Sequence, residues 1–248
     1  MVSLRLTVLG SATPYPAADN PCSGYLVSHG DTRVWMDAGT GTLGPLQRHT
    51  SLATLDAIWI SHLHADHCAD LLTAFYALRY ADVDRAPVPL FGPPGTADRL
   101  AAFLTNGPRR SPVEDAFAIT ELTDGHEARI GGLHLTSRAV RHGLPAFAVR
   151  IEAGTSLTYS GDTAPCAALT DLAQDTGLLL CEADGTVPDE AHHTPEQAGE
   201  TARQARARRL VVTHVGRSLT PQDAVTRAGT RCEGPVGYAA PGAVLTAG

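Results

Sequence analysis

Alternation of apolar and polar positions divides the first part of the chain into short strands. The pattern predicts strands at residues 4–9, 23–28, 33–36 and 57–60, with Gly- and Pro-rich segments between them. Gly30-Asp31 predicts a hairpin turn between the second and third of these strands. Helical spacing of apolar residues predicts a short helix at 43–49 and a longer one at 69–80, which begins directly after the fourth strand.

The remainder of the chain changes from a β-rich middle to alternating strands and helices. Strands are predicted at 88–95 (with a Pro/Gly turn), 117–122, 128–135 (two strands joined by a Gly-Gly hairpin), 146–152, 156–159, 178–181 and 210–213. Helices are predicted at 96–105, 164–174, 195–206 and 221–228. The segment Gly107–Pro112 either covers a site or connects two elements. Because no repeat or linker-like segment interrupts the pattern, we expect one domain, residues 1–248, whose halves share one site.

Composition and charge narrow the class of protein. The 248 residues are 43% hydrophobic and 18% charged, which is typical of a globular chain. A net charge of -7 disfavours binding to a long polyanion. The five cysteines are odd in number and never spaced as Cys-x-x-Cys, so we expect reduced thiols. Because no segment has the pattern of a secretory leader or a membrane span, we expect a cytoplasmic protein that does not bind membranes.

The stretch Ser61-His62-Leu63-His64-Ala65-Asp66-His67 lies where the fourth predicted strand ends and the next helix begins. Its three imidazoles and one carboxylate are the ligands that Zn²⁺ prefers. The alternative is a polar loop in which Asp66 caps the helix. Because so dense a pattern of histidines seldom arises by chance, we interpret the stretch as a metal site.

Further candidate ligands lie at the ends of later predicted strands. These are His142, Asp162 in the string Tyr-Ser-Gly-Asp-Thr, and His214 in Val-Val-Thr-His. Open α/β sheets gather their sites at strand ends, although a single strand-end histidine is more often a structural polar residue. Together with the first motif they favour one shared site. Asp37 also ends a strand beside glycines, where a turn residue is the ordinary interpretation.

With these motifs the chain resembles the metallo-β-lactamase fold, and within it the ribonuclease Z-like branch. The resemblance rests on His-x-His-x-Asp-His, His142, Ser-Gly-Asp-Thr and Thr-His, and it covers nearly the whole chain. The strings Ser-Gly-Tyr-Leu-Val, Leu-Gln-Arg-His and Leu-Cys-Glu-Ala are similar to those of actinobacterial cyclic-nucleotide phosphodiesterases of this fold. The resemblance implies an α/β protein, an αβ/βα four-layer sandwich of two mixed β-sheets flanked by helices, and a homodimer.

The resemblance also implies two divalent metal ions, Zn²⁺ being expected and Mn²⁺ or Fe being the alternatives. The implied ligands are His62, His64 and His142 for one ion and Asp66, His67 and His214 for the other, with Asp162 bridging them. Two such cations would lower the pKa of a shared water, and the bridging hydroxide would attack a phosphodiester. Asp66 would orient or deprotonate that water, and Asp37 would hold a ligand imidazole in the required tautomer.

A proton donor for the leaving alkoxide is implied in the same way. In the branch that the chain resembles, a Glu at the position of Glu182 pairs with a His that precedes a Thr-capped helix. Thr194, Pro195 and Gln197 form the pattern of a capping box, which predicts a helix that starts there. The register His-x-Thr favours His192 over His193, and a polar loop with exposed imidazoles is the alternative.

Two arginines are candidates for contacts to the substrate. Arg217 follows His214 by three residues and could bind a phosphate oxygen, and Arg150 lies on a predicted strand of the β-rich middle. For Arg217 a surface position is at least as consistent with the sequence context.

The function that these observations favour is a metal-dependent phosphodiesterase acting on a small cyclic nucleotide such as cAMP. The alternative is a tRNA 3′-end endonuclease of the ribonuclease Z type. In ribonuclease Z an arm that grips tRNA separates the third ligand His from the bridging Asp, whereas here only residues 143–161 separate His142 from Asp162. A structured nucleic acid is therefore not the expected partner. Hydrolysis of another small ester, lactone or sulfate also remains open, and a regulatory metal protein without turnover is disfavoured by Glu182 and His192.

Overall fold

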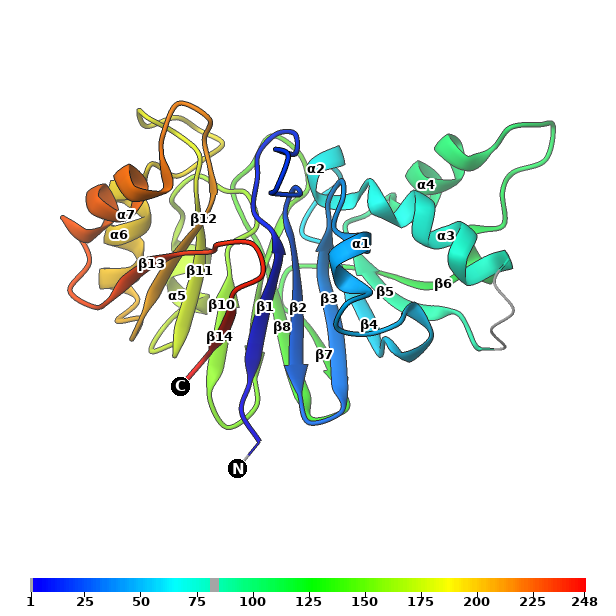
Figure 1. Ribbon diagram of the computed structural model, residues 1–248, viewed down its shortest axis with the longest axis horizontal. Helices are drawn as coiled ribbons and strands as arrows, with labels where there is room; N and C mark the ends of the chain where they lie inside the picture. The colour runs from blue at the N-terminus through cyan, green and yellow to red at the C-terminus, as the bar shows by residue number, and fades with distance from the viewer. Residues whose placement is uncertain (1, 81–84) are drawn as a thin grey trace.

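Two β-sheets pack face to face, and each carries helices on its outer surface (Figure 1). The computed structural model describes residues 2–80 and 85–248, and within them each sheet has seven strands. The expected α/β class, with four layers and two mixed sheets, is confirmed.

The first sheet has the strand order β14-β1-β2-β3-β4-β5-β6. Its strands are β1 (Arg5–Gly10), β2 (Gly24–His29), β3 (Thr32–Ala38), β4 (Ala57–Trp59), β5 (Val88–Gly92), β6 (Phe117–Glu121) and β14 (Val244–Thr246). Neighbours pair antiparallel from β14 to β3 and parallel from β3 to β6. The predicted hairpin at Gly30-Asp31 joins β2 to β3.

The second sheet has the order β13-β12-β11-β10-β9-β8-β7. Its strands are β7 (His126–Ile130), β8 (Leu133–Ala139), β9 (Phe147–Glu152), β10 (Ser156–Tyr159), β11 (Leu178–Ala183), β12 (Leu210–Val215) and β13 (Val236–Tyr238). Pairing is antiparallel from β7 to β10 and parallel from β10 to β13. The predicted Gly-Gly hairpin joins β7 to β8, and Gly131 in it has a φ of +53°.

Helices cover the outer face of each sheet. Along the first sheet lie α1 (Leu43–Leu46), α2 (Ala65–Cys68), α3 (Asp70–Tyr80) and α4 (Thr96–Leu104), and along the second lie α5 (Ala167–Leu172), α6 (Pro195–Gln204) and α7 (Pro221–Gly229). Two short 3₁₀ turns, η1 (Leu52–Thr54) and η2 (Val113–Asp115), complete the described elements. Helix α6 begins with the predicted capping box, in which the Thr194 hydroxyl accepts from the Gln197 backbone.

Two predicted helices are shorter than expected, two strands were not predicted, and one open alternative is decided. The helices expected at 43–49 and 164–174 are only Leu43–Leu46 and Ala167–Leu172. Strands β13 and β14 were not predicted, because each is three residues long and only partly buried at most positions. The segment Gly107–Pro112 lies between α4 and η2, in a connection that projects away from the sheets, so it connects elements rather than covering a site (Figure 1).

The core has one apolar layer between the sheets and one under the helices on each side. Strand β3 shows the principle, because Val34 and Met36 belong to the layer between the sheets whereas Trp35 packs toward α3 and α4. Burial of both faces fixes the register of such a strand in the sheet, because successive side chains point to opposite faces. Tyr159 of β10 contacts Tyr25 in the central layer, with ring centroids 5.2 Å apart.

All five cysteines are free, as predicted. No helix within residues 2–80 and 85–248 combines the length and the apolar character that crossing a membrane requires.

Candidate metal centre

The predicted metal ligands follow the carboxyl ends of strands from both sheets. The segment 61–67 follows β4 of the first sheet, whereas His142 and Asp162 follow β8 and β10 of the second, and His214 lies near the end of β12. Strands β8 and β10 run in the same direction because each pairs antiparallel with β9. The strand ends of both sheets therefore meet at one edge of the sandwich.

The ligand atoms form two neighbouring groups, each with its atoms within 4.8 Å of one another. One group is His62, His64, His142 and Asp162, and the other is Asp66, His67 and His214. Asp162 lies between them. Its Oδ2 is 3.6 Å from Nε2 of His62 and 3.4 Å from Nε2 of His214, and its Oδ1 is 3.3 Å from Nε2 of His67. The structure thus brings all seven predicted ligands together, with Asp162 where a bridging carboxylate would lie.

The chemistry of this cluster fits divalent cations. Nε2 of His67 and Oδ1 of Asp162 are buried, and neither has a hydrogen-bond partner among the described residues. Leaving a buried polar atom unsatisfied costs about 1–3 kcal/mol, so two such atoms aimed at one place indicate a missing partner. Imidazole nitrogens with carboxylate oxygens suit Zn²⁺, and also Mn²⁺ and Fe.

Hydrogen bonds to the Nδ1 atoms of the ligand histidines orient the imidazoles. Nδ1 of His67 donates to Oδ2 of Asp37 at 2.7 Å, and Nδ1 of His142 donates to the carbonyl oxygen of Ala191 at 3.0 Å. Nδ1 of His62 lies 3.0 Å from the Ser61 hydroxyl. When Nδ1 carries the proton, Nε2 keeps the lone pair that a metal requires. These contacts therefore select the ligating tautomers.

Asp37 holds the imidazole of His67, a contact of the kind that the resemblance implies. It is fully buried, and its carboxylate accepts hydrogen bonds from the Ser61 backbone at 2.7 Å, the Ser61 hydroxyl at 2.8 Å and the Tyr159 hydroxyl at 2.8 Å, besides that from His67. Asp37 has a φ of +55° and His214 a φ of +47°. Few non-glycine residues adopt such a conformation, and it costs on the order of 1–3 kcal/mol.

Replacing Asp37 with Asn is expected to weaken metal binding by about 10–100-fold, because the carboxamide cannot accept from every donor that now faces the carboxylate. The metal affinity would be measured by competition with a chromophoric chelator. Asp31→Asn, which alters an exposed acid in the β2–β3 turn, is the matched control. If Asp37→Asn and Asp31→Asn bind the metal with equal affinity, Asp37 does not support the metal centre.

Two glycines allow the backbone segments of the site to approach one another. A Cβ at Gly39 would lie 2.0 Å from the carbonyl oxygen of Asp66. Gly161 has a φ of +57°, and a Cβ there would lie 2.8 Å from the carbonyl oxygen of Phe147 and 2.9 Å from Cβ of Ser61. A side chain at either position would displace the segment that carries the ligands.

Glu182 and His192 form a pair at the edge of the cluster, as predicted. Nδ1 of His192 is 3.1 Å from Oε1 of Glu182, which also accepts from the Thr163 backbone at 2.8 Å. Burial raises the pKa of Glu182 to about 7. Burial alone would lower the pKa of His192, but the hydrogen bond and the charge of Glu182 outweigh it and raise that pKa to about 9. The imidazole therefore holds a proton at neutral pH.

The loop before α6 places His192 over the cluster. Oδ1 of Asp189 accepts from the backbone of Ala191 and of His192, both at 2.7 Å. A ring nitrogen of His192 also lies within 4.8 Å of ligand atoms of Asp162 and His214. The proton that His192 holds is thus close to any group bound at the cluster.

An open cleft of about 430 Å³ lies over these residues. His64, Asp66, Asp162, His192 and His214 line it, together with Thr13, Pro14 and Asp184, which the sequence analysis did not predict. Thr13 and Pro14 belong to the Gly/Pro-rich loop after β1, and such loops at strand ends commonly form site walls. That position was the only signal that the sequence offered for them.

Three candidate residues lie outside the cleft. Arg150 is not at the site, because its guanidinium donates to the carbonyl oxygens of Leu172 and Gln174 at 3.1 and 2.8 Å and so anchors the end of α5. His193 is fully buried, with Nδ1 2.5 Å from the Thr163 carbonyl oxygen. Arg217 lies in a neighbouring hollow and stacks on the ring of Tyr15, with its Cζ 3.9 Å from the ring centroid.

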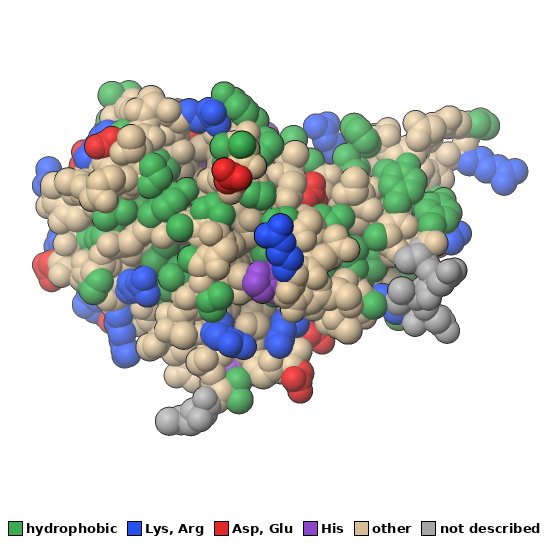
Figure 2. All heavy atoms as spheres, viewed as in Figure 1, with side chains coloured by type: hydrophobic (Ala, Val, Ile, Leu, Met, Phe, Trp, Pro, Cys, Tyr) green, Lys and Arg blue, Asp and Glu red, His purple; other side chains and the backbone are tan. Residues whose placement is uncertain are grey.

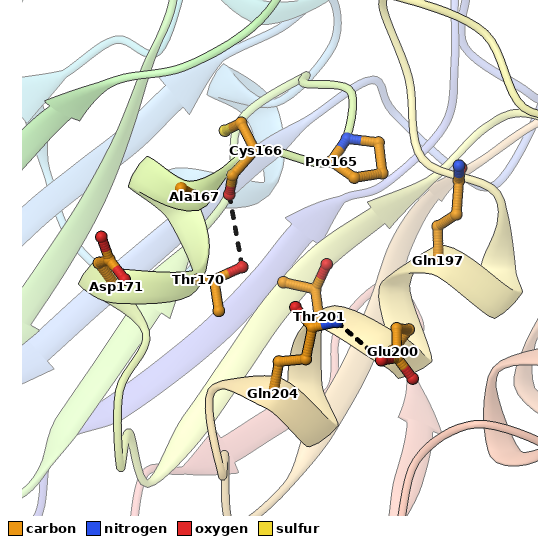
Figure 3. A pocket seen from close by; sticks show the side chains of 9 residues that line it. All are labelled: Pro165, Cys166, Ala167, Thr170, Asp171, Gln197, Glu200, Thr201 and Gln204. Carbon is orange, nitrogen blue, oxygen red and sulfur yellow. Dashed lines mark hydrogen bonds between the residues drawn. The ribbon is translucent and has the colours of Figure 1, made fainter.

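Another hollow of about 430 Å³ separates α5 from α6 (Figure 3). Its walls carry Asp171, Glu200 and Cys166, and it shares no lining residue with the cleft over the metal ligands. It therefore forms no part of the candidate metal centre.

The sequence and the fold of this chain were compared with those of known proteins. Residues 32–215 match the model of the beta-lactamase superfamily domain. An uncharacterized protein of Mycobacterium tuberculosis is 37% identical over 245 residues, which cover 95% of this chain and 89% of the relative. A ribonuclease Z of Mycolicibacterium paratuberculosis is 31% identical over 242 residues, covering 85% of each chain. The metallo-beta-lactamase fold protein YhfI from Bacillus subtilis has a similar structure, with a TM-score of 0.87, 24% identity and coverage of 99% of this chain and 100% of that one.

Proposed function

Because the chain belongs to the beta-lactamase superfamily of metal-dependent hydrolases, we propose that it is a phosphodiesterase that hydrolyses a small cyclic nucleotide such as cAMP. The observation that carries the proposal is the Glu182–His192 pair beside the bridging position of Asp162. Cleavage of a phosphodiester leaves a strongly basic alkoxide, and this pair supplies a proton donor for it.

The residues of the chain have separate tasks in this reaction. Two divalent cations held by the seven ligands would supply a nucleophilic water and a positive clamp for the phosphoryl oxygens. Asp66, with one carboxylate oxygen 3.3 Å from Nε2 of His214, would orient the attacking water and accept its proton. His192 donates its proton to the leaving oxygen, and Glu182 holds the ring by Nδ1 so that Nε2 faces the cleft.

The shape of the site favours a compact substrate. The connection between His142 and Asp162 contains only β9, β10 and their turns. The relative named ribonuclease Z makes precursor tRNA the second candidate substrate. A structured RNA needs a large basic surface, whereas this chain has a net charge of -7.

Removing the metal is expected to abolish hydrolysis of cAMP, because the nucleophile and the charge clamp are lost together. Dialysis against a chelator, followed by titration with Zn²⁺, Mn²⁺ or Fe²⁺ under elemental analysis, would measure this loss and show which ion restores turnover. Bis(p-nitrophenyl) phosphate, a lactone and precursor tRNA would be assayed in parallel. If the loaded protein cleaves precursor tRNA but no cyclic nucleotide, the proposal is wrong.

A further inference from the structure

A second hollow lies next to the metal cleft, between the start of α3 and helix α4. It has a volume of about 290 Å³ and is lined mainly by apolar side chains, among them Leu63, Leu72, Leu100 and Phe103. Ala65 lines both this hollow and the metal cleft. Because Ala65 is exposed and its side chain is a single methyl group, a bound molecule can extend over it from one hollow into the other.

Two exposed side chains of this hollow are free to contact a bound molecule. The Phe103 side chain is 70% exposed on α4, so its ring is open to contact with a bound molecule. Arg99 is the charged residue of the wall, and its guanidinium makes no ion pair or hydrogen bond with any residue in the described ranges. Figure 2 shows hydrophobic side chains gathered on this side of the molecule, over α3 and α4.

We propose that this hollow binds the purine base of the substrate while its cyclic phosphate lies at the metal ligands. The inference rests on the proposed function and specifies which part of the nucleotide is recognised. A volume of about 290 Å³ is below the range of about 300–1,000 Å³ that is typical of drug-sized ligands, so it suits one ring system rather than a peptide.

The chemistry of Phe103 and Arg99 matches a purine. An exposed phenylalanine ring offers a stacking surface for a base. Arginine has only donors, and purines present the N7 acceptor, with O6 beside it in guanine. Guanidinium groups also stack favourably on aromatic rings.

The kinetic test compares cAMP with the 3′,5′-cyclic phosphate of 1-deoxyribose, which has no base. In Phe103→Ala, the ratio of kcat/KM for cAMP to that for the base-free compound is expected to fall by about 5- to 100-fold, as the loss of one base stack would produce. Uracil has no N7 acceptor, so cyclic UMP is the comparison for Arg99. In Arg99→Ala, kcat/KM for cAMP and cGMP is expected to fall relative to kcat/KM for cyclic UMP.

The matched control is Tyr80→Ala. Tyr80 is 66% exposed on the neighbouring helix α3 but does not line the hollow. Its removal deletes as much exposed aromatic surface and is expected to leave the ratio unchanged.

A binding measurement separates failure of this inference from failure of the proposed function. Adenosine, which has no phosphate, is titrated by calorimetry into wild-type and Phe103→Ala protein. Weaker binding to the variant supports the base site even if the enzyme hydrolyses no phosphodiester. Equal binding and equal kinetic ratios would overturn the base site and leave the phosphodiesterase intact.

Light scattering on both proteins tests whether the hollow is instead an interface between copies of the chain. If an oligomer dissociates in Phe103→Ala while the kinetic ratios stay unchanged, the hollow belongs to that interface and the inference is overturned.

Discussion

Asp162→Ala protein is expected to lose its metal and to hydrolyse cAMP at less than about a thousandth of the wild-type rate, equivalent to about 4 kcal/mol of transition-state stabilisation. The reason is geometric. The two Asp162 oxygens lie 3.3–3.6 Å from Nε2 atoms of His62, His67 and His214, so this carboxylate contacts both groups of ligands. Without it, His62 loses the carboxylate that faces its Nε2, and the only described carboxylate that remains beside Nε2 of His67 and His214 is that of Asp66.

Elemental analysis and thermal unfolding with and without Zn²⁺ would measure the effect of Asp162→Ala. The melting temperature of the wild-type protein should rise with added metal, because a ligand that binds only the native state stabilises it. The variant should show little rise. Asp171→Ala, an exposed carboxylate on α5, is the control and should behave as the wild type. Full metal content in Asp162→Ala would contradict the bridging position.

His192→Ala is expected to lower kcat for cAMP by about 10²–10⁴-fold, the range that a positioned general acid contributes. Metal content should remain near that of the wild type, because the ligand imidazoles are oriented by Asp37 and by the Ala191 carbonyl rather than by the His192 ring. A large loss of metal in this variant would instead make His192 a ligand, which its distance to the Asp162 and His214 group also allows. Thermal unfolding would verify that the variant is folded.

The pH dependence gives a second test of the pair. A general acid works only while protonated, so kcat should fall as pH rises through the pKa of His192, which Glu182 raises to about 9. In Glu182→Gln that pKa returns toward its ordinary value, and the alkaline limb should move to lower pH. Cations bound in the cleft would lower the pKa of His192 in both proteins. The alkaline limb of Glu182→Gln would still lie at lower pH than that of the wild type. Identical profiles in the two proteins would exclude Glu182 from the relay.

The cluster of candidate metal ligands could be predicted because each member leaves a local signal. Four of them lie within one short motif, and His142, Asp162 and His214 follow apolar strands whose ends a parallel arrangement brings to one edge. The family resemblance then supplied the two-layered sheet arrangement. Element boundaries differed, and the elements that were missed are the short helix α2, the two 3₁₀ turns and the strands β13 and β14, because such short segments carry too few positions to show a period.

The surrounding residues could be predicted less well, because their roles depend on distant contacts. Asp37 receives its hydrogen bonds from residues 24 to 122 positions away, so its local sequence favoured a turn and only the family resemblance implied its contact with a ligand imidazole. Arg150 was assigned to the substrate on its charge, yet its partners are backbone carbonyls at the end of α5. His193 was a candidate by adjacency to His192, but successive side chains in the loop point in different directions, and its ring packs inward against Thr163.

The left-handed backbone of Asp37 and His214 has a consequence for engineering. Glycine at either position would adopt the same backbone without strain and, by that criterion alone, would make the fold more stable. It would also delete a metal ligand or the group that orients one. At Asp37 the gain from relieved backbone strain would be outweighed by four buried donors left without an acceptor, so a search for a more durable variant should hold both residues constant and seek its gains in the outer helices.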